Sequence, residues 1–95
     1  MKINKPFDQY KNSINSVLSS IDEDQLDGSI NIINKTIKKR GRIYIVGNGG
    51  SSSIASHVSV DFAKVSKVPS STFNNTNLIT CFANDYGYEN WVKQA

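Results

Sequence analysis

The sequence has 95 residues, of which 38% are hydrophobic, and it carries a formal net charge of +3 at pH 7. A chain of this length forms one domain at most and buries a modest core, and its single cysteine, Cys81, excludes an internal disulfide. No apolar run has the length of a signal-peptide core or of a membrane span, so we expect a cytoplasmic protein with no membrane partner.

Residues 1–40 are expected to form two amphipathic helices joined by a short turn. Apolar residues recur at three- and four-residue steps on both sides of Asp22–Asp24, an acidic stretch suited to capping the second helix. Gly41 is the expected C′ residue that ends the second helix. Each helix has an apolar face that needs a partner surface. These faces consist of Phe7, Tyr10, Ile14, Val17, Leu18 and Ile21 in the first helix, and of Leu26, Ile30, Ile33 and Ile37 in the second.

Five of the eleven cations lie close together near the expected end of the second helix. Such a cluster could bind nucleic acid, but no aromatic residues are interleaved with it to stack on bases. Cations at a helix C-terminus also complement the macrodipole, so we expect a solvated helix end and no nucleic-acid partner. The five cations are Lys35, Lys38, Lys39, Arg40 and Arg42.

The next part of the chain alternates strands with a helix. Residues 42–46 include β-branched apolar residues typical of a short buried strand, a third helix is expected over Ser52–Ser66, and a second strand over Ser70–Phe73. This order fits the opening of a parallel α/β sheet with crossover helices, which two strands alone do not complete. The apolar stripe of the third helix consists of Ile54, Val58, Phe62 and Val65.

The C-terminal part begins with turn and N-cap chemistry. Asn74–Asn77 precedes a brief apolar segment, Leu78–Ala83, in which Cys81 is expected to be a small buried core residue. Asn84–Gly87 is expected to break the chain, and Tyr88–Ala95 to begin a further helix.

The stretch IYIVGNGGSSS, Ile43–Ser53, joins the first strand to the third helix through a glycine-rich turn. The first amides of a helix have no intrahelical acceptor, and the helix dipole places partial positive charge there. Glycines let a ligand approach the backbone and serine hydroxyls add donors, so this pattern is typical of a phosphate site.

Three ligands compete with a merely structural turn at this stretch. The dinucleotide fingerprint G-x-G-x-x-G is met at Gly47 and Gly49 but has Ser52 in the third place, and no acidic residue ends the second strand. A nucleotide P-loop requires a lysine in the loop, which this sequence lacks. The third ligand is a phosphorylated small molecule bound by Asn48, the glycines and the serines.

His57 and Asp61 are four residues apart, so they share one face of the third helix. An isolated pair of this kind is often structural. An imidazole and a carboxylate so placed can also share a divalent metal or act as an acid/base pair. Their position one or two turns beyond a phosphate-type turn favours a functional role.

The run Gly47-Asn48-Gly49-Gly50-Ser51, followed by His57 and by Asn84-Asp85-Tyr86-Gly87-Tyr88, resembles the sedoheptulose 7-phosphate (phosphoheptose) isomerases of the sugar isomerase (SIS) domain superfamily. The resemblance covers this whole chain and about the first half of a family member. It implies a three-layer, flavodoxin-like α/β fold with a parallel sheet, incomplete in this chain. Residues 1–40 would then be a helical hairpin for oligomerisation, and residues 41–95 the first half of a phosphosugar-binding domain.

The resemblance also implies a function. Members of the family form homotetramers and convert the ketose sedoheptulose 7-phosphate to the aldose D-glycero-D-manno-heptose 7-phosphate, for bacterial lipopolysaccharide or capsule. Such an isomerisation moves a proton through an enediol and needs a base, an acid and stabilisation of an oxyanion. Asn48, Gly49, Gly50, Ser51, Asn84 and Asp85 match substrate-binding positions, His57 and Asp61 match zinc ligands, and Asp61 also matches the catalytic acid/base position.

Two departures from the family pattern bear on this expectation. The family has glutamate where this chain has Asp61, which is one methylene shorter, and a misplacement of about 1 Å can lower a rate about a hundredfold. The family's second phosphate loop and its late glutamine and histidine are not among these 95 residues. We therefore expect the 95-residue chain to be an inactive fragment. The alternative is a sugar-phosphate-binding or regulatory SIS domain without isomerase activity.

Overall fold

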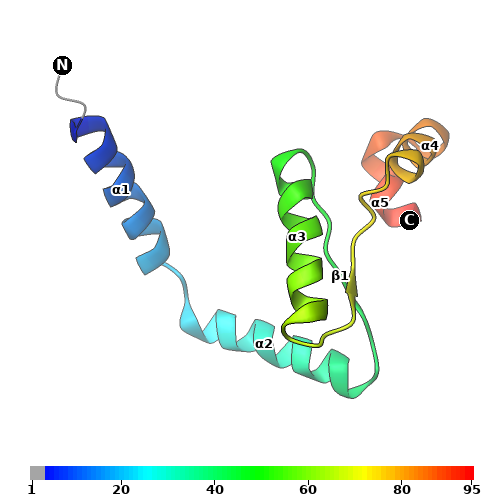
Figure 1. Ribbon diagram of the computed structural model, residues 1–95, viewed down its shortest axis with the longest axis horizontal. Helices are drawn as coiled ribbons and strands as arrows, with labels where there is room; N and C mark the ends of the chain where they lie inside the picture. Colours follow the sequence, from blue (N-terminus) through cyan, green and yellow to red (C-terminus); the bar gives the residue numbers. More distant parts are fainter. Residues whose placement is uncertain (1–3) are drawn as a thin grey trace. The chain divides into compact units, whose positions relative to one another are not determined.

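The computed structural model describes residues 4–95 (Figure 1). Helices dominate, and two short strands form a small parallel sheet, so the predicted α/β class is confirmed. None of the helices in this range is both long and apolar enough to cross a membrane. The elements in chain order are α1 (Asn4–Ser19), α2 (Glu23–Lys38), β1 (Ile43–Tyr44), α3 (Gly50–Lys64), β2 (Ser70–Ser71), α4 (Thr76–Tyr86), the 3-10 helix η1 (Tyr88–Asn90) and α5 (Trp91–Gln94).

Contacts within the chain define two compact units, Met1–Ile32 and Ile33–Ala95. The division falls inside α2, whereas the boundary expected from the sequence lies between residues 40 and 41. The expected boundary separates a helical hairpin from a phosphosugar-binding domain by function, and it stays a prediction. The two units are described one after the other.

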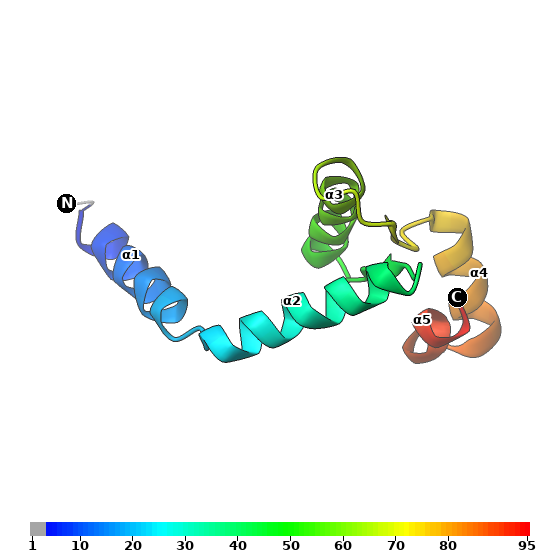
Figure 2. The same ribbon diagram turned by 90° about the horizontal axis from the view of Figure 1, so that it is seen from below.

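The first unit contains α1 and the greater part of α2, both continuous helices (Figure 2). Asp22 caps α2 as predicted, because its Oδ1 accepts hydrogen bonds from the N–H groups of Asp24 at 2.9 Å and Gln25 at 3.3 Å. Most residues of the apolar faces predicted for the two helices are exposed; Val17, for example, is 66% exposed, whereas Ile33 and Ile37 of α2 are half-buried. The described part of the chain therefore leaves most of the area of these two faces uncovered.

The end of α2 is a Schellman motif. The N–H of Gly41 donates to the carbonyl of Thr36 and the N–H of Arg40 to that of Ile37, both at 2.8 Å. The left-handed residue is Arg40, with φ 56°, so the prediction that Gly41 is the C′ residue is wrong by one position. Gly41 is needed for close approach instead, because a Cβ there would lie 2.8 Å from Thr36 Cγ2.

The second unit contains the parallel sheet. Ile43 pairs with Ser70 and Tyr44 with Ser71, and the N–H of Ile45 extends the ladder to the carbonyl of Ser71 at 3.0 Å. The parallel pairing with α3 as the crossover is as predicted. Both strands are shorter than the predicted 42–46 and 70–73, since only two residues of each make the full ladder.

The face of α3 that packs on β2 consists of small and polar residues. Ala55 and Ser59 are its buried residues. The hydroxyl of Ser70 donates to the carbonyl of Ser59, and further hydrogen bonds come from the Asn74 amide. Small side chains let the helix backbone approach the strand closely enough for these bonds to form. We call this contact the polar seam; it comprises Ser52, Ser56 and Ser59 of α3 with Ser70 and Asn74.

The apolar stripe predicted on α3 is real but lies beside the buried face. Val65 is 73% exposed, Ile54 is exposed, and Val58 and Phe62 are half-buried. A stripe of bulky side chains would hold the helix farther from the strand than the hydrogen bonds of the polar seam allow. The stripe is therefore not the face of α3 that contacts β2.

Helix α4 begins as predicted and ends later than predicted. Asn75 is its N-cap, and its Oδ1 accepts hydrogen bonds from the N–H groups of Asn77 at 2.9 Å and Leu78 at 3.3 Å. A break was expected over Asn84–Gly87. This prediction is wrong for the first three of these residues, because the helix continues to Tyr86. It ends at Gly87, where φ is +85° and the N–H donates to the carbonyl of Ala83 at 3.0 Å.

The small core of the described residues contains Ala55, Val68 and Trp91 as its buried hydrophobic residues. The predicted helix over Tyr88–Ala95 is present as η1 followed by α5, which packs against α4 and η1. Cys81 is exposed, not buried as predicted, and its Sγ lies 3.7 Å from Asp85 Oδ2 on the same helix. The thiol faces solvent because it shares the outer face of α4 with that carboxylate, one turn away.

Candidate functional site

The glycine loop, Gly47–Gly50, connects the end of the sheet to α3. Gly49 is the N-cap of α3 with φ +56°, and it provides no side-chain cap. The chain turns tightly here, since the N–H of Ser51 donates to the carbonyl of Asn48 and that of Ser52 to the carbonyl of Gly49, both at 3.0 Å. The N–H groups of Gly47–Gly50 donate to no acceptor within residues 4–95. Four successive free donors thus lie at the positive end of the α3 dipole, the arrangement that binds anions in proteins.

The glycines of this loop serve different purposes. A Cβ on Gly47 would lie 2.5 Å from the carbonyl carbon and oxygen of Ser51, so the first turn of α3 leaves no room for a side chain. Gly49 needs its left-handed backbone conformation. A Cβ on Gly50 would meet nothing within 4 Å, so this position is open to an approaching molecule. Ser51, which follows, is exposed in the first turn of α3.

Asn48 is held from a distant part of the chain. Its Oδ1 accepts a hydrogen bond from the hydroxyl of Tyr88 at 2.9 Å. The sequence placed Tyr88 in the motif Asn84–Tyr88 but indicated no role for it. No local pattern could reveal the contact, because the two residues are forty positions apart.

His57 and Asp61 share one face of α3, as predicted, with His57 Nε2 and Asp61 Oδ2 3.4 Å apart. Their side chains are 79% and 55% exposed. His57 lies two positions before Ser59 and Asp61 two positions after it. Because successive helical residues turn by about 100°, each of the two is about 200° around the helix from Ser59, on the face opposite the polar seam. The pair is a solvated one, which by itself adds little to stability.

These two donors do not by themselves form a metal site. Residues 4–95 contain no group of three histidine, cysteine, aspartate or glutamate side chains that could hold a metal ion. A catalytic zinc site uses three protein ligands and keeps a position for water or substrate. His57 and Asp61 alone therefore do not fit zinc.

Asn84 and Asp85, the other predicted substrate-binding residues, are exposed on the last turn of α4. The Nδ2 of Asn84 donates to Asp85 Oδ1 at 3.1 Å. Within the described chain no hydrogen bond joins either residue to the glycine loop. The structure thus connects the loop to the C-terminal segment through Tyr88 and not through Asn84 or Asp85.

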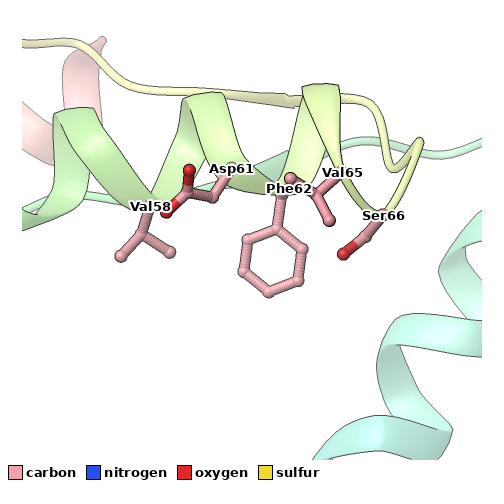
Figure 3. Close-up of a pocket in the computed structure, with 5 residues that line it drawn as sticks. All are labelled: Val58, Asp61, Phe62, Val65 and Ser66. Carbon is pink, nitrogen blue, oxygen red and sulfur yellow. The ribbon is translucent and has the colours of Figure 1, made fainter.

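A hollow of about 380 Å³ lies along the second half of α3 (Figure 3). The sticks in Figure 3 show three apolar side chains, with the Asp61 carboxylate beside Val58 and the Ser66 hydroxyl at the far end. From Gly50 to Phe62 the helix rises by about 18 Å, so the hollow and the glycine loop lie at opposite ends of α3. Its lining residues are Val58, Asp61, Phe62, Val65 and Ser66.

The chain is similar to a known protein family over most of its length. The family described as SIS domain matches residues 9–93. The phosphoheptose isomerase of Helicobacter pylori strain P12 is 34% identical over 93 residues, which cover 92% of this chain and 48% of that protein, and the one from strain Shi470 has the same identity and coverage. The phosphoheptose isomerase of Thermodesulfovibrio yellowstonii is 39% identical over 70 residues, covering 66% of this chain and 35% of that protein. The chain spans about half the length of the Helicobacter relatives. No solved structure gives a significant match.

Proposed function

Because the chain belongs to the SIS domain family, we propose that it binds a phosphorylated sugar at the glycine loop, Gly47–Gly50. The observation that supports this most directly is the row of four free backbone N–H groups at the start of α3. Such a row can surround phosphate oxygens without any side-chain charge. The names of the relatives, phosphoheptose isomerases, favour a heptose phosphate as the sugar.

The reaction that we propose for the complete site is the isomerisation of sedoheptulose 7-phosphate to D-glycero-D-manno-heptose 7-phosphate. The ketose and the aldose interconvert by moving a proton between adjacent carbons, which needs an acid/base group near those carbons. Asp61 is the proposed group in this chain. His57 and Asp61 lie about 10 and 16 Å from Gly50 along the axis of α3, so Asp61 is farther from the loop than one heptose phosphate bound there extends. Its proposed role rests on its match to the acid/base position of the family.

The 95-residue chain alone is proposed to bind without turnover. With two metal donors instead of three, no zinc-dependent step is assigned to it. A zinc site at His57 and Asp61 would need ligands from outside the described residues. Sustained conversion of sedoheptulose 7-phosphate by the purified chain would contradict this proposal.

A binding or regulatory role without isomerisation is the second candidate. The observation in its favour is that Asp61 occupies the position at which the family has glutamate, so its carboxylate is one methylene shorter. If a protein with the complete site and its natural Asp61 isomerises the sugar phosphate, this candidate is excluded.

We expect sedoheptulose 7-phosphate to shift the backbone amide resonances of Gly47–Gly50 in the 15N-labelled chain, because these N–H groups would acquire phosphate as an acceptor. The Gly50→Asp variant should lose this binding, since it places a carboxylate at the anion site. Gly28→Asp is the matched control. Gly28 lies inside α2 and is equally open, because a Cβ there would meet nothing within 4 Å, and its substitution makes the same change of charge.

The affinity of each variant is measured by titrating the 15N-labelled chain with sedoheptulose 7-phosphate and monitoring the amide resonances by heteronuclear NMR. Unphosphorylated sedoheptulose should leave the loop resonances unchanged. Equal binding by Gly50→Asp and Gly28→Asp would show that the loop is not the site.

We also propose that the apolar faces of α1 and α2 mediate homo-oligomerisation. Val17 lies in an apolar hollow of about 240 Å³ on α1, which it lines with Ser13, Ile14 and Leu18. Burial of such faces in a second copy would remove apolar surface from water, the dominant favourable term in association. We expect Val17→Glu to lower the mass measured by light scattering, whereas Asn12→Glu, on the opposite face of α1, should not. Equal masses for the two variants would contradict the proposal.

A further inference from the structure

Tyr88 links the glycine loop to the C-terminal segment by one hydrogen bond, from its hydroxyl to Asn48 Oδ1 at 2.9 Å. Tyr88 follows Gly87, whose φ of +85° turns the chain out of α4. Three residues later Trp91 is 2% exposed and anchors the segment in the core. The N–H of Asn90 also donates to the carbonyl of Gly87 at 3.0 Å, which closes the turn between them. The Tyr88 side chain therefore extends to the loop from a fixed base.

This bond decides which end of the Asn48 amide is available to a ligand. An asparagine side chain has one acceptor, Oδ1, and two donors on Nδ2. With Oδ1 occupied by the tyrosine hydroxyl, the two Nδ2 hydrogens remain for other partners. Without that hydroxyl, the exposed amide can rotate and direct Oδ1, an acceptor, at an anion that needs donors.

We propose that Tyr88 is a positioning residue for the sugar phosphate: it fixes Asn48 so that Nδ2 joins the backbone N–H groups of the glycine loop as a donor. The proposal rests on the proposed function of that loop. It adds a contribution from η1, a part of the chain to which the sequence assigned no role in binding. The hydroxyl itself does not touch the ligand.

The bond should matter for binding more than for stability. Both residues are exposed, so in the free chain water competes for the same donors and acceptors and the net gain is small. Once a ligand is bound, one further oriented donor corresponds to about a fivefold gain in affinity. We therefore expect Tyr88→Phe to weaken binding of sedoheptulose 7-phosphate about fivefold while the urea midpoint of the chain stays unchanged.

Tyr86→Phe is the matched control. Tyr86 is a neighbouring exposed tyrosine whose ring packs edge-on against Phe82, with centroids 5.6 Å apart, and its hydroxyl makes no hydrogen bond within residues 4–95. Removing its hydroxyl deletes the same atom from the same residue type without affecting Asn48. Its affinity should equal that of the wild-type chain.

A double-mutant cycle with Asn48→Ala separates positioning from a general structural effect. Calorimetric titration of the 95-residue chain with sedoheptulose 7-phosphate provides the affinities. If Tyr88 acts through Asn48, Tyr88→Phe has no further effect in the Asn48→Ala background. The same fivefold loss in both backgrounds, or no loss in either, overturns the proposal for Tyr88 alone. Absence of binding by the wild-type chain overturns the proposed function, and this proposal with it.

Discussion

Gly47→Ala is expected to destabilise the chain by about 3 kcal/mol, at the upper end of the usual cost of inserting a methyl group into a filled space. The added Cβ would lie 2.5 Å from the carbonyl carbon and oxygen of Ser51 and 2.8 Å from its Cβ. Two of these three atoms belong to the backbone of α3, so no rotation of a side chain can relieve the clash. The hydrogen bond from the N–H of Ser51 to the carbonyl of Asn48 also opposes any shift of this turn.

Gly50→Ala is the control for this prediction. A Cβ on Gly50 meets nothing within 4 Å, and alanine is a better helix former than glycine at the start of α3. Urea unfolding followed by far-UV circular dichroism should give a lower midpoint for Gly47→Ala and an equal or higher one for Gly50→Ala. A wild-type midpoint for Gly47→Ala would show that the loop can move away from α3.

Trp91→Ala is expected to cost about 3–5 kcal/mol, the usual range for truncating a buried aromatic residue. Trp91 is 2% exposed and is the largest of the three buried hydrophobic residues in the described range. A domain of this size has a total stability at the low end of about 5–15 kcal/mol, so the loss of one such side chain should leave the second unit largely unfolded. Helix α5 has four residues and depends on this contact to stay on α4 and η1.

Val92→Ala tests whether burial is the cause. Val92 is the next residue of α5 and is 42% exposed, so its truncation should cost less than about 1 kcal/mol. The two variants are compared by their helical ellipticity in far-UV circular dichroism. Tryptophan fluorescence cannot be used, because Trp91 is the single tryptophan and the Trp91→Ala variant lacks it. Similar ellipticities for Trp91→Ala and the wild type would mean that this core is not what holds the second unit together.

Local signals predicted the N-caps of α2 and α4 and the parallel pairing, whereas α3 begins two residues before the predicted Ser52. Asp22 and Asn75 cap α2 and α4 as their residue types indicate, since the hydrogen bonds of a cap reach only two or three positions along the chain. The end of α2 was predicted one residue off, because Arg40 adopts the left-handed conformation that glycine favours. The strands were predicted too long. A strand extends only as far as the neighbouring strand pairs with it, and residue propensity does not reveal how long that neighbour is.

The packing face of α3 could not be predicted from hydrophobic periodicity. The spacing of apolar residues indicates only that a segment is helical and which of its sides is apolar. In α3 the apolar side includes Val65 and lines the hollow of Figure 3. The face that contacts β2 is decided by hydrogen-bond partners from another segment, above all Asn74. Likewise the glycine loop was recognised from its local pattern, whereas its link to Tyr88 depends on how the chain folds back.

The polar seam has a calorimetric consequence. Unfolding increases the heat capacity through newly exposed apolar surface and lowers it through newly exposed polar surface. Ser59 and Asn74 contribute polar atoms to the contact between helix and sheet, where most domains of this class bury aliphatic ones. The heat-capacity increment should therefore fall below the usual value of about 12–15 cal/mol/K per residue. A small increment flattens the curve of free energy against temperature, so this chain should lose little of its stability on cooling.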